Sequence, residues 1–182
     1  MGKTAKPPSA KPPTDKELHA TIDAIDKEKH FFRSQADLRK ARTVKKLLNA
    51  DPACQAAMVM WALRKFGALR KKIRSNDPCD FFNCHHIPGY SYHAVNIVPM
   101  LLARKDLPLS DDDVEELLGE VARFDHLAAL PAPFLGPLAG WIEKRKQPLT
   151  AAARKSAKRI AKALLTMEGA EENRLSKRYA AL

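Results

Sequence analysis

Apolar residues recur at steps of three and four along most of the chain, which is the spacing that places them on one face of an α-helix. The first such stripe consists of Leu18, Ile22 and Ile25. It follows Thr14 and Glu17, whose separation is that of a capping box, in which each side chain satisfies a free backbone amide at the start of a helix. The pattern therefore predicts a helix that begins directly after Thr14.

Two further helices are predicted before residue 75. Ser34 is the expected N-cap of one of them, whose apolar positions are Leu38, Ala41, Val44, Leu47 and Leu48. Asp51 followed by Pro52 is typical of a helix start, and the helix that it opens carries Trp61 on its apolar face. This helix is expected to end in a basic run, where cations interact favourably with the helix dipole.

The second half of the chain contains an internal repeat. The segment LLARKDLPLS at 101–110 aligns with WIEKRKQPLT at 141–150, at an offset of 40 residues. Ser110 and Thr150 end these segments as predicted N-caps, and similar apolar positions follow each of them. The pattern predicts two helical hairpins with a period of about 40 residues across residues 91–167.

No segment shows sustained alternation of β-branched and polar residues, and glycine is scarce, with 7 residues against 13 prolines. Hairpin signals are therefore lacking, and we expect an all-α fold, either a short HEAT-like solenoid or an irregular helical bundle. Residues 1–13 contain Lys-Pro-Pro twice and are expected to form a basic disordered tail. Residues 14–182 are expected to form a single domain of six to eight helices.

A repeat of about 40 residues made of two antiparallel helices resembles the HEAT and armadillo families of helical repeat proteins. The Leu-Pro-Leu-Ser-Asp-Asp-Asp turn that starts at Leu107 also resembles the helical regions of large bacterial proteins of the molybdate-regulator-like type. The first resemblance implies stacked hairpins and a role in protein–protein interaction, because such repeats present extended helix surfaces to their partners.

Charge alternates along the sequence. Residues 1–75 carry a net charge of +11, residues 76–125 carry −7 and residues 126–182 carry +7, which leaves +11 for the chain. One interpretation is that neighbouring helices complement one another, and the other is that basic surfaces meet an anionic partner. The acidic run that begins at Asp111 could bind a cation or a basic partner, but carboxylates in a first helical turn also interact favourably with the helix dipole without any partner.

Basic residues on three predicted helices are the candidates for nucleic-acid binding. Stripes of Lys and Arg neutralise phosphates without reading sequence, although they also occur on ordinary solvated helix faces. The candidate residues are Lys45, Lys46, Arg70, Lys71, Lys72, Arg154, Lys158 and Lys162. No sequence signature of a base-reading domain accompanies them, so binding would be non-specific.

The segment DPCDFFNCHHIPGYSYH at 77–93 concentrates cysteine and histidine. A structural zinc there would be held by Cys79, Cys84, His86 and His93, although the last pair is more widely spaced than in zinc fingers. The alternatives are that the cysteines pack as small buried apolar groups, or that Cys84 is a nucleophile. We expect core packing and no cofactor.

Taken together, these features predict a non-catalytic protein-interaction or scaffold module with a protein partner. The alternative is a basic nucleic-acid-associated protein, with or without the structural zinc. No apolar run approaches the roughly 18 residues that span a bilayer, and the N-terminal segment lacks the apolar core of a secretory signal. We therefore expect no membrane insertion and a cytoplasmic location.

Overall fold

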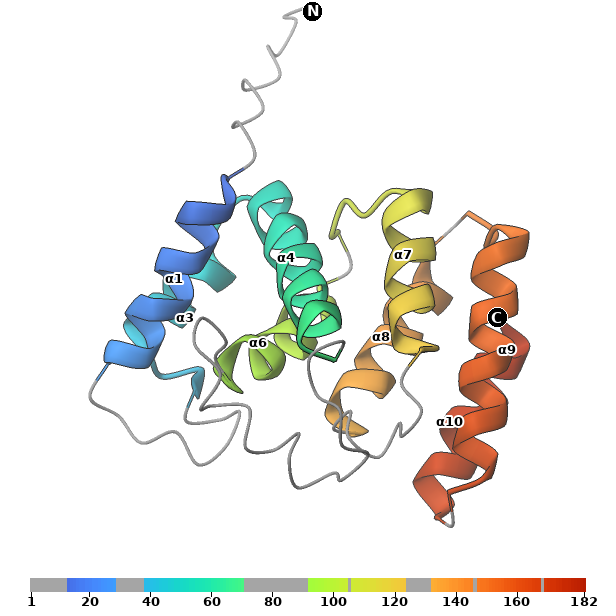
Figure 1. Cartoon of the computed structure of the whole chain (residues 1–182). Helices are drawn as coiled ribbons and strands as arrows, with labels where there is room; N and C mark the ends of the chain where they lie inside the picture. Colours follow the sequence, from blue (N-terminus) through green and yellow to red (C-terminus); the bar gives the residue numbers. More distant parts are fainter. Residues whose placement is uncertain are drawn as a thin grey trace, which may run out of the picture.

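The computed structural model describes residues 13–28, 38–70, 92–104, 106–123, 132–145, 147–167 and 169–182 (Figure 1). The helices in these ranges are α1 (Asp15–Lys27), α3 (Arg42–Leu48), α4 (Pro52–Arg70), α6 (Tyr92–Leu102), α7 (Asp111–Val121), α8 (Ala132–Lys144), α9 (Ala151–Leu165) and α10 (Ala170–Ala181). No strand occurs in the described ranges, so the predicted all-α fold is confirmed.

The helices stand in two rows, and consecutive helices alternate between the rows (Figure 1). One row consists of α1, α4, α7 and α9, and the other consists of α3, α6, α8 and α10; within each row every helix packs on the next. The rows meet where α1 packs on α3, α4 on α6, and α9 on α10. α6 and α8 begin 40 residues apart, and so do α7 and α9. The arrangement is compatible with a helical repeat fold.

Three predicted helix starts are confirmed in atomic detail. Thr14 Oγ1 accepts a hydrogen bond from the Glu17 amide at 3.3 Å, and Glu17 Oε2 accepts from the Thr14 amide at 2.7 Å, which completes the capping box of α1. Ser110 Oγ caps α7 by accepting from the Asp113 amide at 3.1 Å. Thr150 caps α9 in the same way. Each such cap contributes about 1 kcal/mol to stability.

The helix predicted to follow Ser34 is interrupted before α3. Ser34 itself lies outside the described residues, and α3 begins only at Arg42, with Ala41 as an N-cap that offers no side-chain hydrogen bond. Its free amides are satisfied by a distant residue: the Glu28 carboxylate accepts from the amides of Arg42 at 2.8 Å and Thr43 at 2.6 Å. The prediction of a single helix with this apolar stripe was therefore wrong, because the chain leaves the helical conformation between Leu38 and α3, where Ala41 has a ψ of 135°.

The predicted apolar stripes form the core. Leu18, Ile22 and Ile25 on α1 are all buried, as are Val44 and Leu47 on α3. The stripes that follow the two repeated turns are buried too, and they consist of Leu117 and Val121 on α7 and Ala157, Ala161 and Leu164 on α9. Trp61 and Trp141 are buried, as their apolar faces predicted.

Buried polar side chains satisfy backbone carbonyls where helices meet. Ser176 on α10 donates to the Ala161 carbonyl of α9 at 2.8 Å, and the Tyr179 hydroxyl donates to the Leu135 carbonyl of α8, also at 2.8 Å. Burial raises the pKa of Tyr179 well above its usual range, so this hydroxyl remains a donor. These bonds fix α10 against both of its neighbours.

Several expectations fall outside the described residues. Of the predicted tail at residues 1–13, only Pro13 is described, and the segment from 71 to 91 is not described. Among the described helices, none combines the length and apolar character needed to cross a lipid bilayer.

Candidate interaction surfaces

The predicted metal loop cannot be placed from the described residues. Cys79, Cys84 and His86 lie outside them, and for His93 only the position in α6 is described. Within the described ranges, His, Cys, Asp and Glu side chains form no group of three or more that could hold a metal ion. A structural zinc at this loop therefore stays a prediction.

Cys54 is the cysteine that the described ranges include, and it lies half-buried in the first turn of α4. Burial raises the pKa of its thiol, and the negative charges of Asp51 and Glu17 raise it further. A thiol with a raised pKa is protonated at neutral pH and is a weak nucleophile. Cys54 therefore lacks the activation that covalent catalysis requires.

Acidic residues of α7 form hydrogen bonds and ion pairs with other parts of the molecule. Asp111 accepts a hydrogen bond from Arg145, which follows α8, and Glu116 is bound by Arg64 of α4 through two hydrogen bonds of 2.7 and 2.8 Å. The hydrogen bonds from Arg64 hold the pKa of Glu116 below its usual value. These pairs connect α7 to α4 and to the residue that follows α8.

Three more acidic side chains of α7 have internal partners. Glu115 accepts from the Thr150 hydroxyl at 2.6 Å, which joins α7 to the start of α9. Glu120 pairs with Arg123, and Asp113 completes the capping box of its own helix. The acidic segment therefore complements its neighbours inside the molecule, which was one of the two interpretations of the charge pattern.

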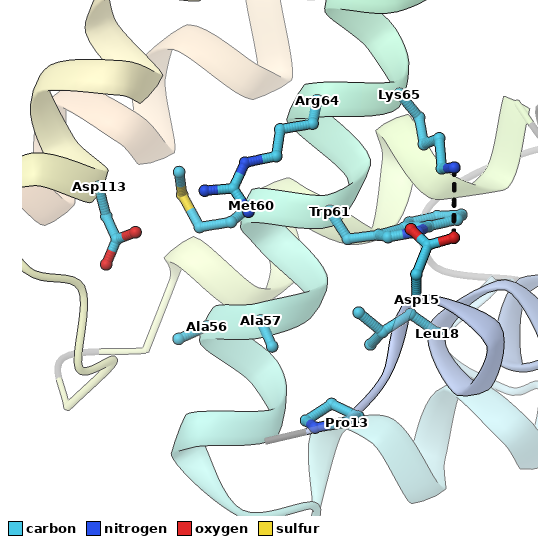
Figure 2. Close-up of a pocket in the computed structure, with 10 residues that line it drawn as sticks. All are labelled: Pro13, Asp15, Leu18, Ala56, Ala57, Met60, Trp61, Arg64, Lys65 and Asp113. Atoms are coloured by element: carbon cyan, nitrogen blue, oxygen red, sulfur yellow. Dashed lines mark hydrogen bonds and ion pairs between the residues drawn. The ribbon is translucent and has the colours of Figure 1, made fainter.

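A groove of about 490 Å³ lies on the row formed by α1, α4 and α7 (Figure 2). We call it the α1–α4–α7 groove. It is lined by Pro13, Asp15, Leu18, Ala56, Ala57, Met60, Trp61, Arg64, Lys65 and Asp113. Figure 2 shows the α4 side chains in the middle, Asp15 and Leu18 of α1 on one side, and Asp113 of α7 on the other. Three helices that are not consecutive in the chain therefore build this one concave surface.

The α1 side of the groove is held by a cluster around Trp61. The indole Nε1 donates to Asp15 Oδ1 at 2.7 Å, and Lys65 Nζ lies 3.4 Å from Asp15 Oδ2 (Figure 2). Lys65 also lies 5.6 Å from the centre of the indole ring, and His19 meets the same ring edge-on at 5.9 Å. Because Trp61 is 6% exposed, its ring anchors α1 to α4 while its edge borders the groove.

The groove combines a small apolar centre with a charged rim. Ala57 and Met60 supply apolar surface between the helices, and the rim carries both signs, with Asp15 beside Lys65 on one side and Arg64 near Asp113 on the other. Protein–protein interfaces have this anatomy, and Trp and Arg are the residue types that most often dominate their binding energy. Neither Cys nor Ser nor His is among the described lining residues.

A second surface follows the exposed side of α9, and we call it the α9 basic face. It consists of Arg154, Lys155, Lys158, Arg159 and Lys162, which are all exposed and which line a shallow hollow of about 640 Å³. Arg154 donates to the Leu149 carbonyl at 3.1 Å, but none of the five forms an ion pair with a described carboxylate.

Five of the eight residues predicted to bind phosphate have described side chains, and the structure places them in two separate groups. Lys45 and Lys46 are exposed on α3, which packs on α1 and α6, whereas α9 packs on α7 and α10 at the other end of the molecule (Figure 1). Arg70 is the last residue of α4 and its side chain is not described, while Lys71 and Lys72 lie outside the described ranges. Arg154, Lys158 and Lys162 come together on α9, joined by two further cations.

Sequence reasoning missed the α1–α4–α7 groove entirely. Asp15 and Trp61 are 46 residues apart and Arg64 and Glu116 are 52 apart, so no local pattern indicated that they meet. Comparison with known proteins finds no matching family, no matching curated sequence and no matching solved structure. Function must therefore be argued from the surfaces themselves.

Proposed function

We propose that the chain is a non-catalytic protein-interaction module of HEAT- or armadillo-like helical hairpins that binds a protein partner in the α1–α4–α7 groove. The observation that carries the proposal is the groove itself, in which three helices place an apolar centre between two charged rims. Concave surfaces built across successive hairpins are the usual binding sites of helical repeat proteins. The cytoplasmic location expected from the sequence belongs to the same proposal.

The size and charge of the groove limit what binds there. A volume of about 490 Å³ accommodates a few side chains rather than a folded domain, so the partner contributes a short helix or an extended segment. Its apolar side chains would contact Ala57 and Met60. Its flanking charges would be of both signs, because Asp15 and Lys65 face them on one rim and Arg64 on the other.

Site-specific photo-crosslinking tests this proposal in cells. A photoreactive amino acid placed at Ala57, which is half-buried in the groove, is expected to capture a protein partner. The matched control places the same amino acid at Ala180, which is exposed on α10 away from the groove. A partner captured at both positions, or at neither, would contradict binding in the groove.

The captured partner then allows a quantitative test with purified proteins. Ala57→Arg would fill the apolar centre with a charged side chain, and we expect it to weaken binding by at least about tenfold, equivalent to about 1.4 kcal/mol. Ala180→Arg introduces the same residue outside the groove and is expected to leave the affinity unchanged. Equal affinities for the wild type and Ala57→Arg would refute the proposed site.

A further inference from the structure

Acidic side chains of α7 bind partners inside the molecule, whereas one group of basic side chains has no described carboxylate partner. On α7 the carboxylates of Asp111, Glu115, Glu116 and Glu120 all bind partners within the molecule. Most described arginines are paired in the same way, and they are Arg64, Arg104, Arg123, Arg145, Arg174 and Arg178. The α9 basic face, by contrast, has five cations without a described carboxylate partner. Internal complementarity therefore accounts for the acidic segment and leaves the basic face unexplained.

The cations of the α9 basic face share one side of a well-anchored helix. They occupy positions 154, 155, 158, 159 and 162, so they follow successive turns over a length of about 12 Å. The opposite side of α9 is buried against α7 and α10 through Ala153, Ala157, Ile160, Ala161 and Leu164. Because the helix is fixed by this packing, the spacing of its charges is fixed as well.

The acidic surface of α7 lies along a different edge of α9. A hollow between the two helices is lined by Glu115, Glu116 and Glu120 of α7 but, on α9, by the small residues Ala152 and Ser156. The cations of the α9 basic face are absent from its described lining. They line a separate hollow instead, whose described lining holds no carboxylate.

We propose that the α9 basic face binds the phosphate backbone of double-stranded nucleic acid without reading its sequence. This inference stands independently of the groove and of its protein partner. Phosphates of one strand advance about 3.4 Å along a duplex, so a stripe of about 12 Å faces three or four of them. Lys and Arg are the side chains that supply such contacts.

The residue types in the α9 basic face favour double-stranded nucleic acid over other polyanions. It contains no aromatic residue on which unpaired bases could stack, which disfavours single strands. It contains no Asn or Gln to read base edges, which disfavours sequence recognition. The apolar side of α9 is buried in the core and only Leu165, at the end of the helix, is a large exposed apolar residue among those described, whereas a helix that binds a membrane surface must insert a whole apolar side into lipid.

The proposal predicts how steeply the binding affinity falls as the salt concentration rises. Each phosphate that a cation neutralises contributes about −0.9 to the slope of log K against log salt, so four contacts give a slope of about −3.6. Affinity would then fall about 150-fold between 50 and 200 mM salt. Removal of three cations would reduce the slope to about −1.8.

Fluorescence anisotropy with a labelled 20-base-pair DNA duplex and the purified full chain tests the proposal. The test variant is Lys155→Gln/Lys158→Gln/Lys162→Gln. The control variant, Lys16→Gln/Lys45→Gln/Lys46→Gln, removes the same charge from exposed positions on α1 and α3. We expect the α9 variant to bind at least about tenfold more weakly at 100 mM salt with the smaller slope, and the control to stay within about twofold of wild type.

Three outcomes would overturn the proposal. Equal losses in the two variants would mean that net charge alone attracts the duplex, and absence of binding at 50 mM salt would mean that the face does not bind nucleic acid. Competition by poly-glutamate as effective as that by duplex of equal charge would identify an acidic polypeptide as the ligand. Because all six substituted side chains are exposed, thermal melts of both variants are expected to match the wild type.

Discussion

Gln55 fixes the connection between α3 and α4, and replacing it tests how much this buried hydrogen bonding contributes to the stability of the fold. The side chain is fully buried, and its Nε2 donates to the carbonyls of Leu47 at 2.9 Å, Leu48 at 3.0 Å and Ala50 at 3.2 Å. The last carbonyls of a helix have no partner within the helix, so a buried helix end needs such a donor. Gln55→Ala would remove it and leave these acceptors without the amide.

The expected loss of stability follows from the hydrogen bonds that the two N–H groups of the Gln55 amide donate. Each buried hydrogen bond contributes about 1 kcal/mol net, and the small cavity left by the missing atoms adds to this. We expect Gln55→Ala to lower the free energy of unfolding by about 2–3 kcal/mol, measured by urea denaturation. Gln147→Ala is the matched control, because Gln147 is exposed and its replacement should change stability by less than about 0.5 kcal/mol.

The isosteric variant Gln55→Glu separates hydrogen bonding from volume. Its carboxylate would face three carbonyl oxygens in a buried site, and both burial and those dipoles would raise its pKa in the folded state. A raised pKa means that the folded state prefers the protonated form. The variant should therefore lose stability as the pH rises above the ordinary glutamate pKa of about 4.3. A loss below about 0.5 kcal/mol for Gln55→Ala, or a Gln55→Glu stability independent of pH, would refute this reasoning.

Two further predictions concern a surface ion pair and the undescribed loop. Because Arg64 holds the pKa of Glu116 below its usual value, the pair stabilises the fold above about pH 4.3, and this stabilisation is lost as the pH falls through the lowered pKa. Arg64→Met should therefore lower the free energy of unfolding by less than about 1 kcal/mol at pH 7 and leave it unchanged in strong acid. Urea denaturation at each pH measures both values. Native mass spectrometry should give the metal-free mass, whereas a zinc adduct that Cys79→Ser/Cys84→Ser removes would make the loop a structural metal site.

The local features of this fold were readable in the sequence. Capping residues such as Thr14 and Ser110 act on amides within three residues, and apolar stripes repeat within one helix, so both leave a short-range signal. The α9 basic face was predicted for the same reason, since all of its residues belong to one helix. The start of α3 was not predicted, because Glu28 caps it from 14 residues earlier in the chain.

The α1–α4–α7 groove shows the limit of such reasoning. Trp61 was correctly placed in the core from its apolar stripe, but its hydrogen bond to Asp15 depends on how α1 packs on α4. The alternation of charge along the chain had two interpretations, and only the packing of α4 and α9 against α7 showed that acidic side chains of α7 are paired inside the molecule. Sequence patterns therefore predicted the faces of single helices, and the structure was needed to join them into surfaces.

The central claim is that a protein partner binds in the α1–α4–α7 groove, and the Trp61 indole tests it most directly. The chain has two tryptophans, so a ¹⁵N-labelled sample gives two indole N–H signals, from Trp61 at the groove and from Trp141, which is absent from its lining. On titration with the partner captured at Ala57, the account predicts that the Trp61 signal shifts and the Trp141 signal stays. A shift of Trp141 alone, or no shift at saturating partner, would contradict it.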